Sequence, residues 1–230
     1  MAEGRWWKLR VDDDNDHAKD AYDLFEAYRA VPDFLGHVLE IGCGPFTQLR
    51  TILGSPDHTY EVSSVTLVDP ILIHESKHPK SSYGSGQFEA HGTLYHTKLH
   101  QVGAEDVGRM YHEHFDTVIM QNVLEHVVDA YAVLESMYNA TKVGGVVVLW
   151  EPTYSAQWSG WVDAGIHELV YDVNWPAVFD DIAHPIRADP SVLRHFASFF
   201  DPIMWKETPG RRGDMSAMLV GRKKRLSTEL

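Results

Sequence analysis

Short hydrophobic runs alternate with amphipathic stretches along most of this chain. Five of the runs are short and are bounded by glycine, proline or polar residues, which is typical of β-strands in a buried sheet. These expected strands cover residues 37–41, 65–68, 98–102, 115–120 and 146–150. Apolar residues at helical spacing predict helices at 18–30, from near 47, at 129–140 and at 190–199, and a closing pair of strands is expected at 203–206 and 215–220.

Strands that alternate with helices pair in parallel, through right-handed crossovers that place helices on both faces of the sheet. The pattern therefore predicts an α/β fold in one domain over residues 1–230. We expect it to consist of a helical N-terminal cap (1–36), a sheet core that binds the ligand (37–152), a lid inserted after the fifth strand (153–189), and a closing helix and strand pair (190–223). Ligands of such sheets bind beyond the carboxyl ends of the strands, where the strand order reverses.

The charge and cysteine content narrow the range of partners. A formal net charge of -13 over 230 residues disfavours a nucleic-acid partner, because phosphate binding needs a basic groove. The basic stretch at 221–225 is expected to be a solvated extension. The single cysteine, Cys43, excludes an internal disulfide, and the longest apolar run, at 146–150, is too short for a bilayer. With no signal-peptide pattern at its start, the chain is expected to be cytoplasmic and not bound to membranes.

A glycine turn follows the first strand and contains Gly42 and Gly44. Glycines allow positive φ angles and a close approach of the backbone to a ligand. A dinucleotide-binding fingerprint needs a third glycine three residues later, where this chain has Thr47, so a nicotinamide oxidoreductase is disfavoured. Glu40 precedes the turn, at a point where a carboxylate can meet a cationic amino group. Asp69 ends the second strand, where an acidic residue can accept hydrogen bonds from ribose hydroxyls.

Four segments together resemble the motifs of class I S-adenosylmethionine-dependent methyltransferases, in the same order and with matching gaps. They are the glycine turn at 38–45, the second strand with its aspartate at 65–69, the fourth strand with the segment after it at 115–127, and the turn and fifth strand at 139–152. The resemblance implies a Rossmann-like sheet of seven strands, mostly parallel with the last strand antiparallel, and S-adenosylmethionine as cofactor.

By carry-over from this resemblance, Gly42 and Gly44 would bracket the methionine part of the cofactor, with Glu40 near its amino group. Asp69 would hold the ribose, and Gln121 would face the cofactor with its backbone. The whole set implied to bind the cofactor is Glu40, Gly42, Cys43, Gly44, Asp69, Pro70, Ala104, Glu105 and Gln121. Two positions depart from the family pattern: Phe46 replaces the third glycine of the turn, and Gly103 replaces an aspartate that bonds the adenine.

Methyl transfer from a sulfonium needs alignment in a dry pocket more than a fixed catalytic triad. His126, after the fourth strand, is the candidate general base; a structural hydrogen bond at that turn is the alternative. No metal site is expected there, because Asn122 stands where some relatives have an acid. The histidines of 112–114 are expected at the surface. The group at 180–184 has a spacing that could bind a metal or cap a helix, and the cap is favoured.

The expected lid at 153–189 is longer than an ordinary connection and rich in aromatic residues. Aromatic walls suit a planar acceptor or an amine that becomes cationic on methylation. Packing of the same rings onto the sheet is the alternative. The candidate acceptor-binding residues are Tyr154, Trp158, Trp161, His167, Trp175 and Arg187.

The leading hypothesis is an enzyme that methylates an O, N or S atom of a small molecule. A protein or RNA methyltransferase is one alternative; it would need an open acceptor face instead of an aromatic roof. A partner subunit that binds the cofactor without turnover is another, since Phe46 and Gly103 depart from the pattern while Gly42, Gly44 and Asp69 are intact. The sequence does not indicate an oligomeric state.

Overall fold

The computed structural model describes residues 28–55, 59–72, 77, 81–124, 127–152, 190–209 and 215–225. Their strands are β1 (Phe34–Ile41), β2 (Glu61–Val68), β3 (Gln87–Ala90), β4 (Thr93–His100), β5 (Phe115–Gln121), β6 (Thr141–Pro152), β7 (Phe200–Pro209) and β8 (Met215–Lys223). The helices are α3 (Gln48–Leu53), the 3-10 helix η1 (Ala104–Asp106), α5 (Val107–Met110), α6 (Ala130–Ala140) and α10 (Pro190–Phe199).

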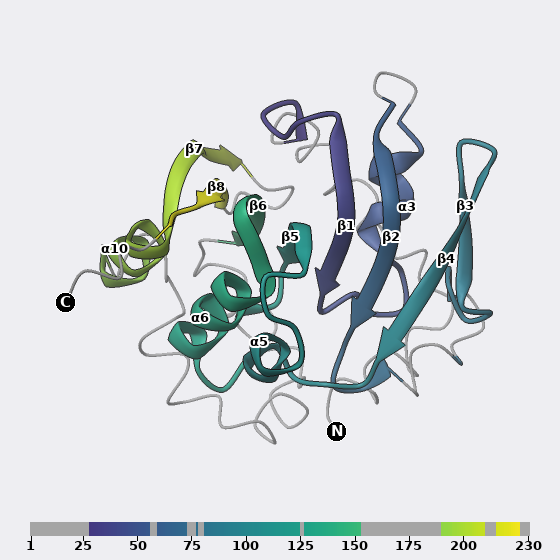
Figure 1. The fold of residues 1–230 in the computed structure, drawn as a ribbon, viewed down its shortest axis with the longest axis horizontal. Helices are drawn as coiled ribbons and strands as arrows, with labels where there is room; N and C mark the ends of the chain where they lie inside the picture. Colours follow the sequence, from purple (N-terminus) through teal and green to yellow (C-terminus); the bar gives the residue numbers. More distant parts are fainter. Residues whose placement is uncertain are drawn as a thin grey trace.

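The strands form one sheet in the order β3-β4-β2-β1-β5-β6-β8-β7 (Figure 1). The five strands from β4 to β6 are parallel to one another, and β8 runs antiparallel to both β6 and β7. The predicted α/β fold with a mostly parallel sheet and an antiparallel last strand is therefore confirmed. The chain moves outward from β1 to β2 and β4, then returns to β5 on the other side of β1, so the strand order reverses between β1 and β5.

The sheet has eight strands, one more than the seven expected, because β3 pairs antiparallel with β4 as a hairpin at the edge. The hairpin turns at His91 and Gly92, whose φ angles are 48° and 75°. Positive φ at both central residues is what a two-residue hairpin turn of the tight, twisted kind requires. Phe88 and Tyr95 stack across the two strands with ring centroids 5.3 Å apart.

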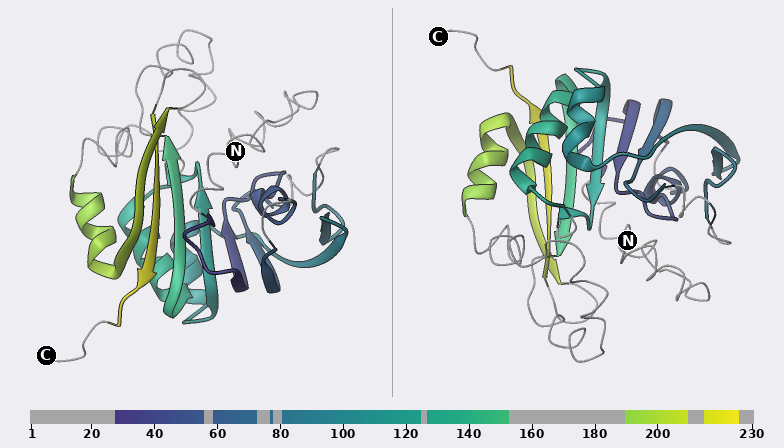
Figure 2. Two further views of the ribbon diagram at one scale, coloured as in Figure 1. Left: turned by 90° about the horizontal axis from the view of Figure 1, so that it is seen from above. Right: turned by 90° about the horizontal axis from the view of Figure 1, so that it is seen from below.

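Hydrophobic side chains leave both faces of the sheet and form two cores. The helices α5, α6 and α10 cover one face, where Val107, Leu134 and Phe196 pack on the sheet. Helix α3 and Tyr28 cover the other face. Figures 1 and 2 show α5 and α6 on the side of the sheet opposite α3. Helices on both faces are what the parallel crossovers require, and they leave the carboxyl ends of the strands as the place for a ligand.

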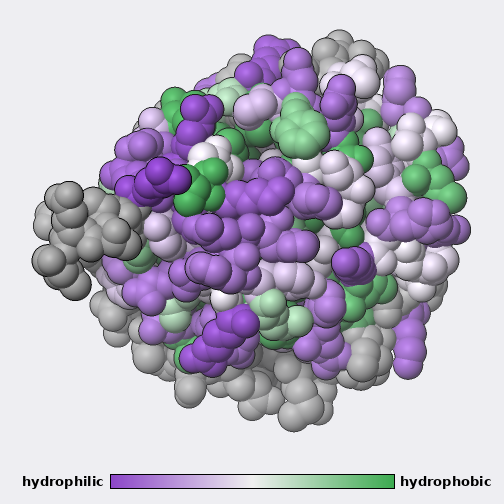
Figure 3. Space-filling model, viewed as in Figure 1, coloured by the Kyte–Doolittle hydropathy of each residue, from purple (hydrophilic) through white to green (hydrophobic). Residues whose placement is uncertain are grey.

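On the face seen in Figure 3, hydrophilic residues predominate and hydrophobic ones lie in separate small patches. The exposed large hydrophobic residues in the described chain include Leu94, Met110 and Val143, which belong to three different segments. None of the described helices is long and apolar enough to cross a membrane.

The expectation of a solvated basic extension at 221–225 is wrong. Residues 221–223 are the end of β8, and the ammonium group of Lys223 is buried. It donates hydrogen bonds to the Thr141 carbonyl at 2.8 Å and to Glu113 at 3.1 Å, and it lies 4.1 Å from the centroid of the Tyr138 ring. Lysine can be buried in this way because its charge is paired and its donors are satisfied.

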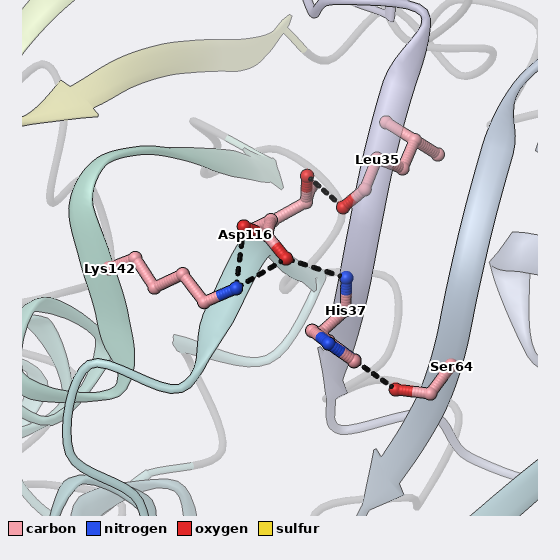
Figure 4. A network of polar contacts seen from close by, with 6 residues as sticks. Leu35, His37, Ser64, Asp116 and Lys142 are labelled. Carbon is pink, nitrogen blue, oxygen red and sulfur yellow. Dashed lines mark hydrogen bonds and ion pairs between the residues drawn. The ribbon is translucent and has the colours of Figure 1, made fainter.

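An ion-pair network connects β1, β5 and β6 near the amino-terminal ends of β5 and β6, and Figure 4 shows its contacts. Asp116 accepts the backbone N–H of His37 at 2.8 Å, and Lys142 donates to both of its carboxylate oxygens at 2.8 Å. Gly36 makes this approach possible, since an added Cβ would lie 2.4 Å from the Asp116 Oδ2 atom. The network is structural in character, because its groups satisfy one another.

Candidate active site

The carboxyl ends of β1, β2 and β5 meet where the strand order reverses (Figure 1). Ile41 pairs in register with Val68 on one side and with Met120 on the other. The residues next after Ile41, Val68 and Met120 therefore lie side by side. They are Gly42 and Asp69, which follow β1 and β2, and Gln121, the last residue of β5.

The glycine turn is held tightly to the neighbouring strands. Gly42 has a φ of 70° and Gly44 a φ of 53°, both in the left-handed region that favours glycine. The Gly42 N–H donates to the Val68 carbonyl at 2.8 Å. A Cβ added at Gly42 would lie 2.2 Å from the Cγ2 atom of Val123, in the segment after β5. Glycine is therefore needed at position 42 for the close approach of a protein side chain, in addition to any ligand.

The carboxylate of Glu40 is buried and bonds to the protein. It accepts the hydroxyl of Thr47 and, at 2.9 Å, the backbone N–H of Gln48. Thr47 is the N-cap of α3 and makes no side-chain capping bond to the helix, so Glu40 supplies that acceptor from β1. Burial raises the pKa of Glu40 to about 7, although the bonds from Thr47 and from the backbone of Gln48 and Leu49 act in the opposite direction.

Asp69 links the end of β2 to the glycine turn. One carboxylate oxygen accepts the Gly44 N–H at 3.3 Å, and the other accepts the Ile71 N–H at 2.9 Å. The side chain is buried, and Pro70 beside it is exposed. A carboxylate can accept about four hydrogen bonds, so Asp69 can hold this turn and still accept from a ligand.

Ala104 and Glu105 lie in η1, directly after β4. Ala104 is buried, whereas Glu105 reaches across to the segment that precedes α6. Its Oε1 atom accepts the N–H groups of Val128 at 2.8 Å and of Asp129 at 3.4 Å. The Glu105 side chain therefore ties the segment after β4 to the segment after β5. Both of these hydrogen bonds of the Glu105 carboxylate are to the protein backbone.

Gln121 ends β5 and is buried beneath the turn. Its amide nitrogen donates to the hydroxyl of Tyr28 at 3.5 Å, and Tyr28 itself is completely buried. Burial raises the pKa of the Tyr28 hydroxyl well above its ordinary value, so Tyr28 stays neutral. The next residue, Asn122, has a φ of 55° and donates its N–H to the Trp150 carbonyl at 2.8 Å. This turn sends the chain away from the sheet at the point where it faces the glycine turn.

Cys43 points into the protein. Its thiol lies 3.3 Å from the hydroxyl of Tyr83, which in turn donates to the Gly44 carbonyl. Tyr83, Tyr28, Val123 and Trp150 all support the site, and sequence reasoning missed them. Of these four residues, only Trp150 could have been found from the sequence, because it is an aromatic residue near the end of the strand that leads into the expected lid.

Several predicted site residues lie outside the described part of the chain. The candidate base His126 is one, and so is its neighbour Glu125. The candidate acceptor-binding residues are also outside it: Tyr154, Trp158, Trp161, His167, Trp175 and Arg187. Among the described residues, no group of three or more His, Cys, Asp or Glu side chains is placed to hold a metal ion. His112 and His114 are exposed, as expected.

A scan against protein families matches residues 16–199 to a family described as a methyltransferase domain. The match covers most of the chain, so this protein belongs to that methyltransferase family. The motif resemblance to the class I S-adenosylmethionine-dependent methyltransferases is thereby confirmed, and the cofactor of that class is S-adenosylmethionine. No curated protein sequence matches the chain significantly.

Solved structures support the fold. The N-methyltransferase NodS from Bradyrhizobium japonicum WM9 matches with a TM-score of 0.60 and 12% identity, over 93% of this chain and 99% of NodS. Its complex with S-adenosyl-l-homocysteine matches with a TM-score of 0.57 and 13% identity, over 96% and 98% of the two chains. A mutant of the 16S rRNA (adenine(1408)-N(1))-methyltransferase from Catenulisporales acidiphilia matches with a TM-score of 0.52 and 14% identity, over 88% and 92%.

Proposed function

We propose that this methyltransferase transfers the methyl group of S-adenosylmethionine to an O, N or S atom of a small-molecule acceptor. The observation that carries the proposal is the convergence of Gly42, Asp69 and Gln121 at the point where the strand order reverses. A net charge of -13 argues against RNA as the acceptor, because the phosphates of RNA would be repelled.

We infer that the turn from Gly42 to Gly44, with Cys43 between them, receives the methionine part of the cofactor through its backbone. The Glu40 carboxylate already accepts hydrogen bonds at the N-terminus of α3. We therefore propose that the side chain of Gln48, and not Glu40, bonds the ammonium group of the cofactor directly. The Oε1 atom of Gln48 is buried and has no hydrogen-bond partner among the described residues. A cationic amino group would satisfy this acceptor and would lie near the Glu40 carboxylate.

We propose that residues after β2 and β4 bind the nucleoside part of the cofactor. We propose that Asp69 accepts the ribose hydroxyls and that Pro70 borders the same turn. We propose further that Ala104 and Glu105 lie beside the adenine, where the buried Ala104 would supply an apolar contact. Because the Glu105 carboxylate already bonds Val128 and Asp129, its contribution to adenine binding would come from its backbone.

When bound, S-adenosylmethionine supplies a methyl group on a positively charged sulfur, which is already an activated leaving group. The chain's task is to align the acceptor atom in line with that bond and to exclude water. We propose that His126 removes a proton from acceptors that must lose one, and that the aromatic segment 153–189 covers the acceptor. Residues Tyr154, Trp158, Trp161, His167, Trp175 and Arg187 are the proposed contacts in that segment.

Calorimetric titration with S-adenosylmethionine and S-adenosylhomocysteine tests the cofactor assignment. We expect micromolar binding of both by the wild type. Asp69→Ala should weaken binding at least tenfold, which corresponds to about 1.4 kcal/mol. Asp201→Ala is the matched control, because this exposed aspartate lies at the start of β7, away from the site, and pairs with Lys224, which follows β8.

Turnover is then measured as formation of S-adenosylhomocysteine with a panel of small hydroxyl, amine and thiol acceptors. Cofactor binding without turnover on any acceptor would favour a non-catalytic partner subunit. Failure of the folded wild-type protein to bind either cofactor form would refute the placement of S-adenosylmethionine at these strand ends.

A further inference from the structure

Trp150 carries a buried hydrogen-bond donor that the described part of the chain does not use. It lies near the carboxyl end of β6, with a side chain only 8% exposed. Its indole nitrogen, Nε1, is buried and has no hydrogen-bond partner among the residues that the structure describes. Leaving such a donor unsatisfied costs about 1–3 kcal/mol, so buried polar groups of this kind are normally paired. This unpaired donor indicates that something other than the described chain accepts from it.

The position of Trp150 relates it directly to the candidate active site. Trp150 is the register partner of Gln121 on the parallel strand β5, so the two side chains leave the same face of the sheet. The Trp150 carbonyl accepts the N–H of Asn122, the first residue of the turn after β5. Since Ile41 pairs with Met120, the Gln121 and Trp150 pair lies one residue further along, at the level of Gly42.

Gln121 adds a second polar group on the same face. The amide nitrogen of Gln121 donates to the Tyr28 hydroxyl, so the amide oxygen of Gln121 points away from Tyr28. Tyr28 and Trp150 belong to the same hydrophobic cluster, which otherwise consists mostly of aliphatic and aromatic side chains. A single unused donor in apolar surroundings is an arrangement that orients one polar atom of a ligand.

We propose that the indole N–H of Trp150 donates a hydrogen bond to an oxygen atom of the methyl acceptor and thereby positions that molecule beside Gln121. The inference rests on the proposed function, because it assumes that the acceptor binds at the carboxyl ends of β5 and β6. It makes Trp150 a positioning residue that also determines specificity.

The chemistry of the indole group defines the class of acceptor. An indole N–H is a donor only, and it offers no lone pair to a protonated amine. The group that meets Trp150 must therefore carry a lone pair, and we take it to be a carbonyl, carboxylate, ether or hydroxyl oxygen, since these are the commonest strong acceptors of small molecules. Small oxygen-bearing aromatic compounds, such as hydroxybenzoates and catechols, fit this description, whereas alkyl amines without an oxygen atom do not.

The test follows the indole signal of Trp150 by NMR in 15N-labelled protein saturated with S-adenosylhomocysteine. The chain has seven tryptophans, so the signal is assigned by its loss in Trp150→Phe. The compounds added at millimolar concentration are 4-hydroxybenzoate and catechol, with benzylamine as the matched control without oxygen. We expect the oxygen-bearing compounds to move the Trp150 signal downfield and to slow its exchange with water, and benzylamine to leave it in place.

The inference is overturned if the Trp150 signal stays in place with both oxygen-bearing compounds, or moves equally with benzylamine. Trp150→Phe, checked for folding by circular dichroism, should bind the oxygen-bearing compounds about tenfold more weakly and should keep its affinity for S-adenosylhomocysteine. Titration of S-adenosylhomocysteine into the same sample separates the two proposals. If S-adenosylhomocysteine does not bind, the proposed function fails. If it binds but the Trp150 signal does not move with the oxygen-bearing compounds, only the role proposed for Trp150 is refuted.

Discussion

The Cα of Gly42 and the side chain of Val123 approach each other so closely that no side chain fits between them. A Cβ at position 42 would lie 2.2 Å from Val123 Cγ2. Gly42 follows β1 and Val123 follows β5, so this contact closes the sheet at the point where its strand order reverses. The glycine turn of the motif is therefore a packing requirement of the fold as well as a place for a ligand.

Gly42→Ala should be markedly more destabilising than Gly92→Ala. Both glycines have a positive φ, 70° and 75°, so both variants carry the same backbone strain. Only Gly42 also faces a neighbour, since no atom of the described residues lies within 4 Å of a Cβ at Gly92. We expect the free energies of unfolding, measured by urea denaturation, to differ by about 1–3 kcal/mol. Equal losses in the two variants would show that the contact with Val123 is unimportant.

Replacing Val123 tests the same contact from the other side. In a Val123→Ala background, Gly42→Ala should cost less than it does in the wild type, because part of the clash is gone. The strain of the positive φ remains, so the rescue should be partial. Additive losses in the double variant would contradict this coupling.

Glu40 should make the stability of the protein depend on pH between about 4.5 and about 7. Burial raises the pKa of this carboxyl from 4.5 to about 7 in the folded protein. The folded state therefore holds the proton more tightly, and this contribution is complete below about 4.5 and is lost as the pH rises through 7. Relative to Glu40→Gln, the wild type should lose on the order of 3 kcal/mol across this interval.

Unfolding free energies of both proteins, measured by denaturant at a series of pH values, check this prediction. Glu61→Gln is the control, because Glu61 is exposed at the start of β2. Parallel pH curves for the wild type and Glu40→Gln would mean that the carboxyl titrates in the folded protein as it does in the unfolded chain.

Asp116 should stabilise the fold without affecting the cofactor. Burial raises the pKa of this carboxyl, but the bonds and charge of Lys142, together with the His37 N–H, lower it below its usual value. Its contribution is present at neutral pH and is lost as the pH falls through its folded-state pKa. Asp116→Asn should cost about 1–3 kcal/mol at pH 7 and leave the affinity for S-adenosylhomocysteine unchanged.

Thermal unfolding and calorimetric titration measure the two effects on the same samples. Asp106→Asn serves as the comparison, because Asp106 forms an exposed ion pair with Arg109 at 2.6 Å and such pairs contribute little. A loss of cofactor affinity in Asp116→Asn would indicate that the two ends of the sheet are coupled.

Lys223 should be the most sensitive basic residue at the end of β8. Lys223→Met removes the bonds to Glu113 and to the Thr141 carbonyl, and we expect a loss of about 1–3 kcal/mol in chemical denaturation. Arg222→Met, at an exposed neighbouring position, should change stability by less than about 0.5 kcal/mol. Equal losses of stability in Lys223→Met and Arg222→Met would show that burial of Lys223 does not stabilise the fold.

Local sequence signals were sufficient for the five parallel strands, for the closing strand pair, and for the helices near 47, at 129–140 and at 190–199. Hydrophobic runs stopped by glycine or aspartate placed the ends of β1 and β2 correctly, and Asp129 before the apolar helical pattern matches the N-cap of α6. The hairpin of β3 and β4 was missed in part because its turn, at His91 and Gly92, is a weaker signal than Asn-Gly.

The tertiary structure alone decided what the polar residues of the site do. Glu40 bonds Gln48, Gln121 bonds Tyr28, and Glu105 bonds Val128, and in each case the partner comes from another segment of the chain. The same holds for Lys223, which packing of β8 against β6 buries beside Thr141.

The sequence by itself therefore determined which residues stand at the strand ends, because the period of hydrophobic residues and the positions of glycine and aspartate are local properties of the chain. Which of those residues are already paired, and that Trp150 keeps a donor unused by the described chain, was decided only in the folded protein. Hydrogen-bond partners depend on how distant segments pack, and no local pattern records that packing.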